Sequence, residues 1–143
     1  MNFRVSTQVN RGVDQTFAIA TDLERLPEWE GSFEEVRAET PGPLQVGTRY
    51  WCRRTLPSRT ESSMTVRELD PNRYLLVEGE WVGFLQPVFD IEVEGNEGGA
   101  RLTLVARSQL RGVMRVLDPV LGLYGRRASA KYLAAWKRLI EAS

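Results

Sequence analysis

The side chains able to carry acid–base or nucleophilic chemistry are few, and one type is missing altogether. The 143 residues contain no histidine and a single cysteine, Cys52. The chain therefore lacks the commonest general base, the commonest transition-metal ligand and every Ser-His or Cys-His nucleophile pair. We expect no metal site, no cofactor and no covalent intermediate, and we interpret Cys52 as a small core residue.

Hydroxyl and guanidinium groups are what remains to assist proton transfer. The sequence offers four candidates: Tyr50, Arg54, Ser108 and Tyr124. None of them belongs to a recognisable catalytic motif. We therefore assign no residue as catalytic, and whether the protein is an enzyme stays open at this point.

Arg54 carries a charge that must be accommodated. In a strand over 48–55, Tyr50, Cys52 and Arg54 share one face. An arginine that points inward needs a carboxylate partner or an anionic ligand group, because an unpaired buried charge is costly. Glu61 and Asp90 are candidates for the partner. A solvated Arg54 at the rim of the fold is the favoured alternative.

The elements that position these groups follow from the spacing of the apolar residues. Alternation with a period of two predicts strands over 3–9, 33–39, 48–55, 62–69, 74–80, 88–94 and 101–110. Two short helices are predicted over 14–19 and 23–26. From residue 113 the period changes to three or four. This predicts a long helix that begins near Asp118, with a looser segment before it.

The long helix is expected to turn one apolar stripe toward the sheet. Its members recur at helical spacing: Leu117, Leu121, Tyr124, Ala128, Tyr132, Ala135 and Leu139. Pro119 and Gly122 are expected to loosen the first part of the helix, whereas Ala128 and Ala135 are expected to allow its close approach to the sheet. Basic residues are expected on a solvated back, which we favour over a membrane-facing or RNA-facing stripe: Arg126, Arg127, Lys131, Lys137 and Arg138.

The fold class follows from the order of these elements, and the composition indicates the expected partners and cellular location. Runs of strands bracketed by helices indicate an α+β fold with an antiparallel sheet, and the lack of repeats or linkers predicts one domain over 1–143. Nineteen basic residues balance nineteen acidic ones, which argues against nucleic acid as a partner. No signal peptide or membrane-spanning segment is evident. We expect a cytoplasmic monomer or homodimer without integral membrane contact.

Five short segments, spread over nearly the whole chain, together carry a resemblance to a known family. They are 13–17 (VDQTF), 22–29 (DLERLPEW), 46–50 (VGTRY), 66–71 (VRELDP) and 98–103 (GGARLT). In this order the chain resembles the START-like (SRPBCC) superfamily, specifically its polyketide cyclase/dehydrase branch. The resemblance implies a helix-grip fold, in which a curved antiparallel sheet wraps around a long C-terminal helix and two short helices follow the first strand.

The resemblance also implies a cavity that holds a small hydrophobic or aromatic ligand. It puts Tyr50 inward and three strand triplets on the concave face: Leu75, Val77 and Gly79; Phe89, Ile91 and Val93; and Leu102, Leu104 and Ala106. The expected ligand-binding residues, with the cavity beside the first part of the long helix, are Trp29, Tyr50, Cys52, Arg54, Met64, Val77, Trp81, Phe89, Leu104, Leu117, Leu121 and Tyr124. Cyclase/dehydrase-type catalysis, a non-catalytic lipid or hydrophobe carrier or sensor, and a protein-interaction module are the alternative functions.

Overall fold

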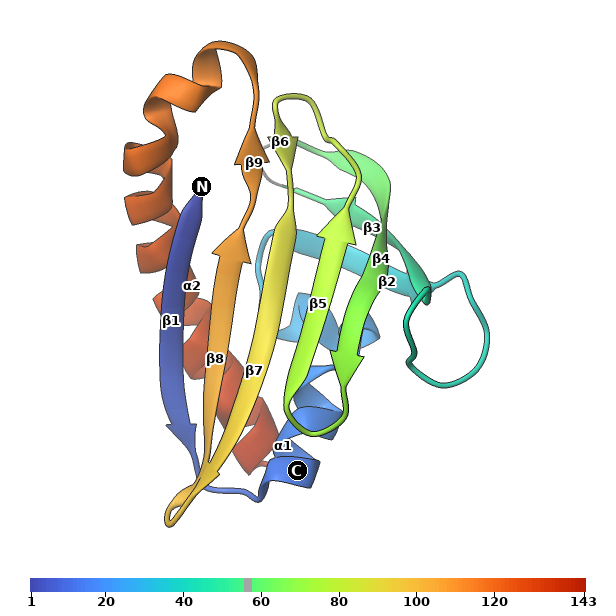
Figure 1. Ribbon diagram of the computed structural model, residues 1–143, viewed down its shortest axis with the longest axis vertical. Helices are drawn as coiled ribbons and strands as arrows, with labels where there is room; N and C mark the ends of the chain where they lie inside the picture. The colour runs from blue at the N-terminus through green and yellow to red at the C-terminus, as the bar shows by residue number, and fades with distance from the viewer. Residues whose placement is uncertain (56–57) are drawn as a thin grey trace.

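A computed structural model describes residues 1–55 and 58–143. In these residues seven antiparallel strands form one curled sheet in the order β1-β8-β7-β5-β4-β3-β2 (Figure 1). The strands of this sheet are β1 (Asn2–Val9), β2 (Phe33–Ala38), β3 (Arg49–Arg54), β4 (Thr60–Asp70), β5 (Tyr74–Gly79), β7 (Val88–Asn96) and β8 (Gly99–Arg107). The helix-grip α+β fold expected from the sequence is confirmed.

The alternation in the strands sorts side chains between the two faces of the sheet. Val77, Ile91 and Leu102 are fully buried on the concave face, whereas the residues between them point to the outer face. The predicted concave triplets in β5, β7 and β8 are therefore on the expected side. The uncertain face of β3 is also resolved, because Tyr50, Cys52 and Arg54 are all buried.

Four small elements lie outside the seven-stranded sheet: two short helices and two short strands, which form a sheet of their own. The helix α1 (Val13–Ala20) and the 3₁₀ helix η1 (Leu23–Glu28) follow β1, as predicted. Gly12 takes the N-cap position of α1, and Asp14 lies in its first turn. The two-residue strands β6 (Leu85–Gln86) and β9 (Gln109–Leu110) pair with each other. β6 was not predicted, because two residues are too few to show a period, whereas β9 forms the end of the strand predicted over 101–110.

The long helix α2 (Asp118–Glu141) follows the 3₁₀ helix η2 (Gly112–Leu117), so the predicted start and the looser segment before it are confirmed. It passes behind the sheet, with its C-terminal end beside α1 (Figure 1). Its predicted inner face is wrong by about one position. The side chains that α2 buries are Gly122, Ser129, Leu133, Trp136 and Ile140. Tyr132, Ala135 and Leu139 flank this stripe, half-buried against the core.

Glycine in the first half of α2 permits close approach rather than loosening the helix. A Cβ atom on Gly125 would lie 2.8 Å from the ring of Phe3, and one on Gly122 would lie 3.2 Å from the carbonyl oxygen of Asn2. Any larger residue at either position would push α2 away from β1. Close approach, which the sequence led us to expect at Ala128 and Ala135, therefore also occurs at Gly122 and Gly125.

Two tryptophans fix α2 to the other side of the fold. Trp29 directly follows η1, and its ring stacks on that of Trp136 with centroids 4.0 Å apart and an interplanar angle of 6°. Trp136 is completely buried and Trp29 nearly so. Aromatic pairs of this kind bury a large apolar area and add a stacking term. The stack therefore joins the segment that precedes β2 to the middle of the second half of α2.

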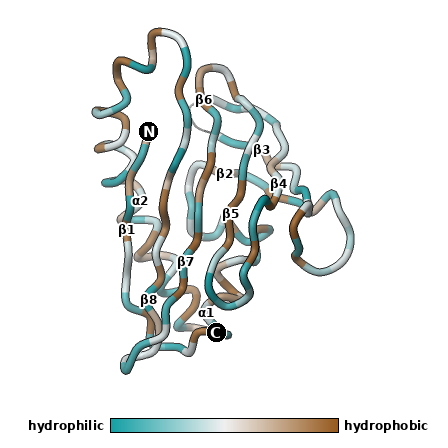
Figure 2. Tube along the Cα trace, in the orientation of Figure 1, coloured by the Kyte–Doolittle hydropathy of each residue, from teal (hydrophilic) through white to brown (hydrophobic). Residues whose placement is uncertain are grey.

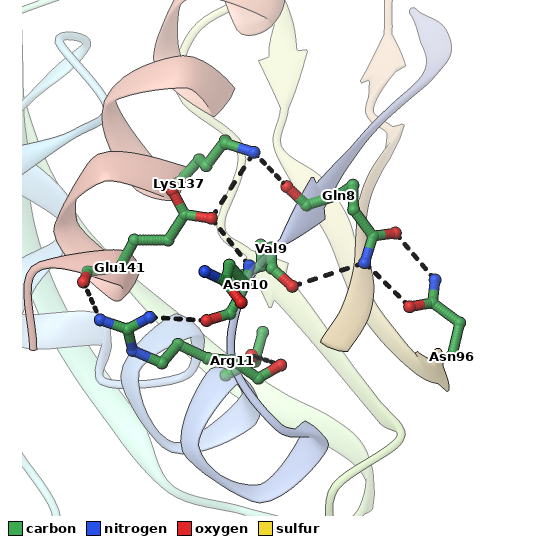
Figure 3. Close-up of polar contacts among 8 residues, drawn as sticks. Gln8, Val9, Asn10, Arg11, Asn96, Lys137 and Glu141 are labelled. Atoms are coloured by element: carbon green, nitrogen blue, oxygen red, sulfur yellow. Dashed lines mark hydrogen bonds and ion pairs between the residues drawn. The ribbon is translucent and has the colours of Figure 1, made fainter. Parts of the chain in front are cut away.

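A polar network clamps the C-terminal end of α2 to the end of β1 (Figure 3). The Glu141 carboxylate accepts a hydrogen bond of 2.7 Å from the backbone N–H of Asn10. Lys137 donates to the carbonyl oxygen of Gln8, and Arg11 donates to the carbonyl oxygen of Glu141. Gln8 and Asn96 exchange two amide hydrogen bonds of 2.8 Å. The last turns of α2 are thus held by both the core and this network.

We predict that Trp136→Ala lowers the free energy of unfolding by about 3–5 kcal/mol, because it removes a fully buried aromatic ring and leaves a cavity against Trp29. Arg138→Ala, an exposed position on the same helix, serves as the control and should change stability by less than about 0.5 kcal/mol. Urea denaturation measures both. A Trp136→Ala variant as stable as Arg138→Ala would contradict the role of the stack.

A second prediction concerns how the stability of the protein depends on pH. The hydrogen bond from the Asn10 backbone N–H lowers the pKa of Glu141 below its ordinary value. A lowered pKa in the folded state contributes stability above the pKa of the unfolded chain, and this contribution is lost as the pH falls through the folded-state value. Melting temperatures of the wild type and Glu141→Gln should therefore differ at neutral pH and converge in acid. Glu97→Gln, in the exposed β7–β8 turn, should parallel the wild type throughout.

Candidate functional site

A half-enclosed cavity of about 160 Å³ lies between the concave face of the sheet and the middle of α2. Its wall is mostly apolar. The apolar side chains that line it are Met1, Phe3, Leu26, Trp29, Phe33, Leu85, Pro87, Val88, Phe89, Leu104, Ala106 and Ala128. The remaining lining residues are Glu30, Ser32, Arg54, Ser108, Gly125, Ser129 and Tyr132. Strands from both edges of the sheet, η1 and α2 therefore all contribute to one small space.

Arg54 is the charged group that this wall buries most deeply. It is the last residue of β3, and its register partner in β2 is Phe33, over whose ring the guanidinium lies at 4.2 Å. Its side chain is 8% exposed, and its Nε has no hydrogen-bond partner among the described residues. Burial lowers the pKa of Arg54 from its ordinary value. A cation is thus held against the cavity, where the ring of Phe33 and the nearby Cys52 and Glu30 side chains offset only part of its desolvation.

The two carboxylates considered as partners for Arg54 are engaged elsewhere. Glu61 accepts from Arg53 at 3.1 Å on the outer face of β3. Asp90 is fully buried beneath the outer face of the sheet, where it accepts from Tyr74 at 2.7 Å and from Arg107 at 2.9 Å. The expectation of a solvated Arg54 is also wrong. β3 directs residue 54 to the same face as Tyr50, and the segment before β2 covers it.

Glu30 is the carboxylate that shares the cavity wall with Arg54. Both of its oxygens accept from Ser32, one from the backbone N–H at 3.0 Å and one from the hydroxyl at 2.5 Å. Glu30 is therefore occupied in shaping the turn before β2. Its charge favours the ionised form of Arg54 from a distance without capping the Nε.

Hydroxyl groups supply the other polar atoms of the wall. Ser108 accepts from the backbone N–H of Val88 at 3.2 Å, and Ser129 is buried on the inner face of α2. Burial raises the pKa of the Tyr132 phenol, which stays protonated across the physiological range. The arrangement is a largely apolar pocket with neutral hydroxyls, the carboxylate of Glu30, and a guanidinium whose Nε has no partner in residues 1–55 and 58–143. It is chemically complementary to an apolar molecule that carries a negative or strongly polarised oxygen.

The structure brings four of the twelve expected ligand-binding residues to this cavity. They are Trp29, Arg54, Phe89 and Leu104. Four others are buried in the core below it and do not line it: Tyr50, Cys52, Met64 and Val77. Cys52 packs as a small core residue, with its sulfur 3.6 Å from the Ser62 hydroxyl.

The last four expected residues lie away from the cavity. Trp81, Leu117 and Tyr124 are exposed at the surface, and Leu121 is half-buried without lining the cavity. The cavity accordingly sits beside Gly125 to Tyr132, one to two turns further along α2 than expected. The first turns of α2 approach the backbone of β1 closely at Gly122, whereas the inner side chains at Ala128 and Ser129 are small and border the cavity.

Several residues that line the cavity were not predicted as ligand-binding residues, although the sequence pattern indicated them. Ala106 continues the alternation of Leu102 and Leu104, and Ala128 and Tyr132 belong to the predicted helical stripe. Phe33 had no such signal, because its contribution depends on the pairing of β2 with β3 and not on local period. The serines of the wall likewise become visible only once the strands are placed.

Comparison with known proteins identifies the family. The model of the family described as "Polyketide cyclase / dehydrase and lipid transport" matches residues 1–141. The chain belongs to this family. A search of curated protein sequences gives no match. The resemblance seen in the sequence is thereby confirmed over almost the whole chain.

Solved structures similar to this family member agree in fold. TTHA0849 from Thermus thermophilus has a TM-score of 0.78 at 13% identity, with 99% of this chain and 98% of that chain covered. SA2116 from Staphylococcus aureus, described as a protein of unknown function, has a TM-score of 0.76 at 11% identity, with 99% of this chain and 94% of that chain covered. The di-domain ARO/CYC StfQ from the steffimycin biosynthetic pathway has a TM-score of 0.72 at 16% identity, with 99% of this chain and 49% of that chain covered. At these identities the likeness concerns the fold alone.

We predict that Arg54→Met leaves the protein as stable or raises its free energy of unfolding by about 1–4 kcal/mol, because an apolar group of similar length replaces an unpaired buried charge. Arg53→Met is the matched control on the same strand. It removes partly exposed outer-face ion pairs with Glu34 and Glu61 and should change stability little. Guanidinium titrations compare the two. A large loss of stability in Arg54→Met alone would mean that its guanidinium is already satisfied.

Proposed function

We propose that this protein binds a small apolar or aromatic molecule with an anionic oxygen, in the cavity between the sheet and α2. The observation that carries the proposal is the buried guanidinium of Arg54, whose Nε lacks a partner among the described residues. A carboxylate, phenolate or enolate of the ligand supplies both the missing acceptor and the missing charge. Phe89, Leu104 and Trp29 offer the apolar surface for the remainder of the molecule.

The volume limits the size of the ligand. A cavity of about 160 Å³ is close to the roughly 150 Å³ that accommodates one benzene molecule in an engineered protein core. It is smaller than the roughly 300–1,000 Å³ of pockets for drug-sized molecules. One ring or a short branched chain therefore fits, whereas an extended polyketide needs a wider cavity. This favours a binding protein, acting as a carrier or sensor of a compact ligand.

A cyclase/dehydrase-type activity is the second candidate. Its support is that Arg54 shares the wall with the hydroxyls of Ser108, Ser129 and Tyr132, which can hold or pass a proton. Membership of the polyketide cyclase/dehydrase and lipid transport family, and the likeness to a di-domain ARO/CYC, are consistent with both candidates. A protein-interaction module gains no support from the cavity.

We further propose that residues 1–143 act as one domain in a reducing, cytoplasmic setting. One cluster of buried side chains joins β1, η1, the central strands and the end of α2, which supports a single folding unit. The buried free thiol of Cys52 is compatible with a reducing compartment.

The ligand class can be tested by calorimetric titration with benzoate, benzylamine and toluene. These probes share one ring and differ in charge. Benzoate should bind about 10- to 100-fold more tightly to the wild type than to Arg54→Met, which corresponds to one charge-assisted hydrogen bond. Toluene should bind both proteins equally, and benzylamine should bind neither well.

A pair of volume variants on α2 provides the control for location. Ala128→Phe fills the cavity wall and should abolish binding of benzoate and toluene alike. Ala130→Phe lies on the exposed side of the same turn and should leave both affinities unchanged. Benzoate binding that survives both Arg54→Met and Ala128→Phe would place the ligand elsewhere and refute the proposal.

A further inference from the structure

A ridge of exposed apolar side chains runs along η2 and the first turns of α2. Val113, Val116 and Val120 are 85%, 81% and 65% exposed. The whole set, here called the apolar ridge, comprises Val113, Val116, Leu117, Val120, Leu123 and Tyr124. Figure 2 shows hydrophobic colour recurring in this part of the trace, at the end of the molecule where η2 arches over. Contiguous exposed apolar surface of this kind marks an interaction site.

The apolar ridge lies on the side of α2 turned away from the sheet. Its members recur three or four residues apart, so they share one side, and the buried stripe of Gly122 and Ser129 occupies the other. This explains why Leu117 and Tyr124 were expected to face inward. Their helical period is real, but in this part of α2 the inward side is made by glycine and serine. The larger side chains are left in solvent.

The charges around the apolar ridge are almost all positive. Between residues 111 and 140 the sequence contains one acidic residue, Asp118, which pairs with the amino group of Met1 at 2.5 Å. The same stretch contains seven basic residues: Arg111, Arg115, Arg126, Arg127, Lys131, Lys137 and Arg138. Apolar side chains flanked by arginines and lysines on a helix are complementary to a surface with an apolar interior and anionic head groups.

We propose that the apolar ridge docks peripherally on an anionic lipid bilayer, with η2 and the first turns of α2 lying in the plane of the interface. Valine and leucine side chains enter the acyl boundary, Tyr124 lies at head-group level, and Arg115, Arg126 and Arg127 contact lipid phosphates. The contact is peripheral, because no helix in residues 1–55 and 58–143 is long and apolar enough to cross a membrane. It does not depend on what the cavity binds.

Charge favours a bilayer over a second copy of the chain. A symmetric pairing of two ridges would bring the arginines of both copies together with no free carboxylate in the same stretch to compensate them.

Trp81 extends the docking surface at the end of the ridge. It is 38% exposed in the loop between β5 and β6, and the guanidinium of Arg111 lies 4.8 Å from its ring. Arg111 also donates to the carbonyl oxygen of Gly83 at 2.9 Å. The loop and the start of η2 are therefore held together, and they present an aromatic ring and a cation typical of membrane interfaces.

The experiment is co-sedimentation of the full chain with two kinds of vesicle, phosphatidylcholine alone and an equal mixture of phosphatidylcholine and phosphatidylglycerol. The wild type should bind the mixed vesicles, weakly at high salt, and bind phosphatidylcholine at least about tenfold less. The double variant Val116→Glu/Val120→Glu should lose binding to both by about tenfold or more. Val46→Glu, 60% exposed in the loop between β2 and β3, should bind like the wild type.

Charge is tested by Arg127→Glu, which should reduce binding to the mixed vesicles only, against the control Arg73→Glu in the β4–β5 turn. All of these positions are exposed, so melting temperatures should stay within about 2 °C of the wild type. The proposal is overturned if wild-type protein binds neither vesicle, or if Val116→Glu/Val120→Glu binds as well as Val46→Glu. It is also overturned if light scattering shows a dimer that this double variant converts to a monomer.

Discussion

The stacking of Trp29 on Trp136 is the contact on which the grip of the sheet around the helix depends. A sheet that curls over a helix must be joined to it at both edges. At the β1 edge the join is a close backbone approach through Gly122 and Gly125. At the β2 edge the join is aromatic, since Trp29 immediately precedes the turn into β2. The cavity is the space enclosed between these two joins.

The first, middle and last turns of α2 pack differently, and this accounts for the position and the size of the cavity. The first turns approach the backbone of β1 closely at Gly122, and the last turns are filled by Trp136 and Ile140 and clamped by Glu141. Between them, the small residues Gly125, Ala128 and Ser129 line the cavity. A compact cavity with Arg54 in its wall is what remains, so the same packing sets both the volume and the chemistry of the site.

Much of the fold was predictable from the sequence, because strand alternation and the change of period near residue 113 are local signals. The wall of the cavity was predictable where a lining residue belongs to such a pattern, as Phe89 and Leu104 do. It was not predictable where tertiary contacts decide. In its first half α2 buries a side made of glycine and serine and leaves its larger apolar side chains exposed, which is the reverse of what the helical period predicts. Arg54 shows the same limit, since its burial depends on the segment that covers β3.

The pairing of β1 with β8 has a consequence for how the protein is made. Asn2 pairs with Arg107 and Val9 with Ala100. At ordinary rates of translation, β8 is synthesised about 5–20 s after β1, so β1 stays unpaired for that time. Until then β1 has no neighbour on either edge, and pairing across such a long chain segment is slow. α2, which closes the cavity, is completed later still. A nascent chain that still lacks β8 and α2 therefore has no complete cavity, because residues of both elements line it.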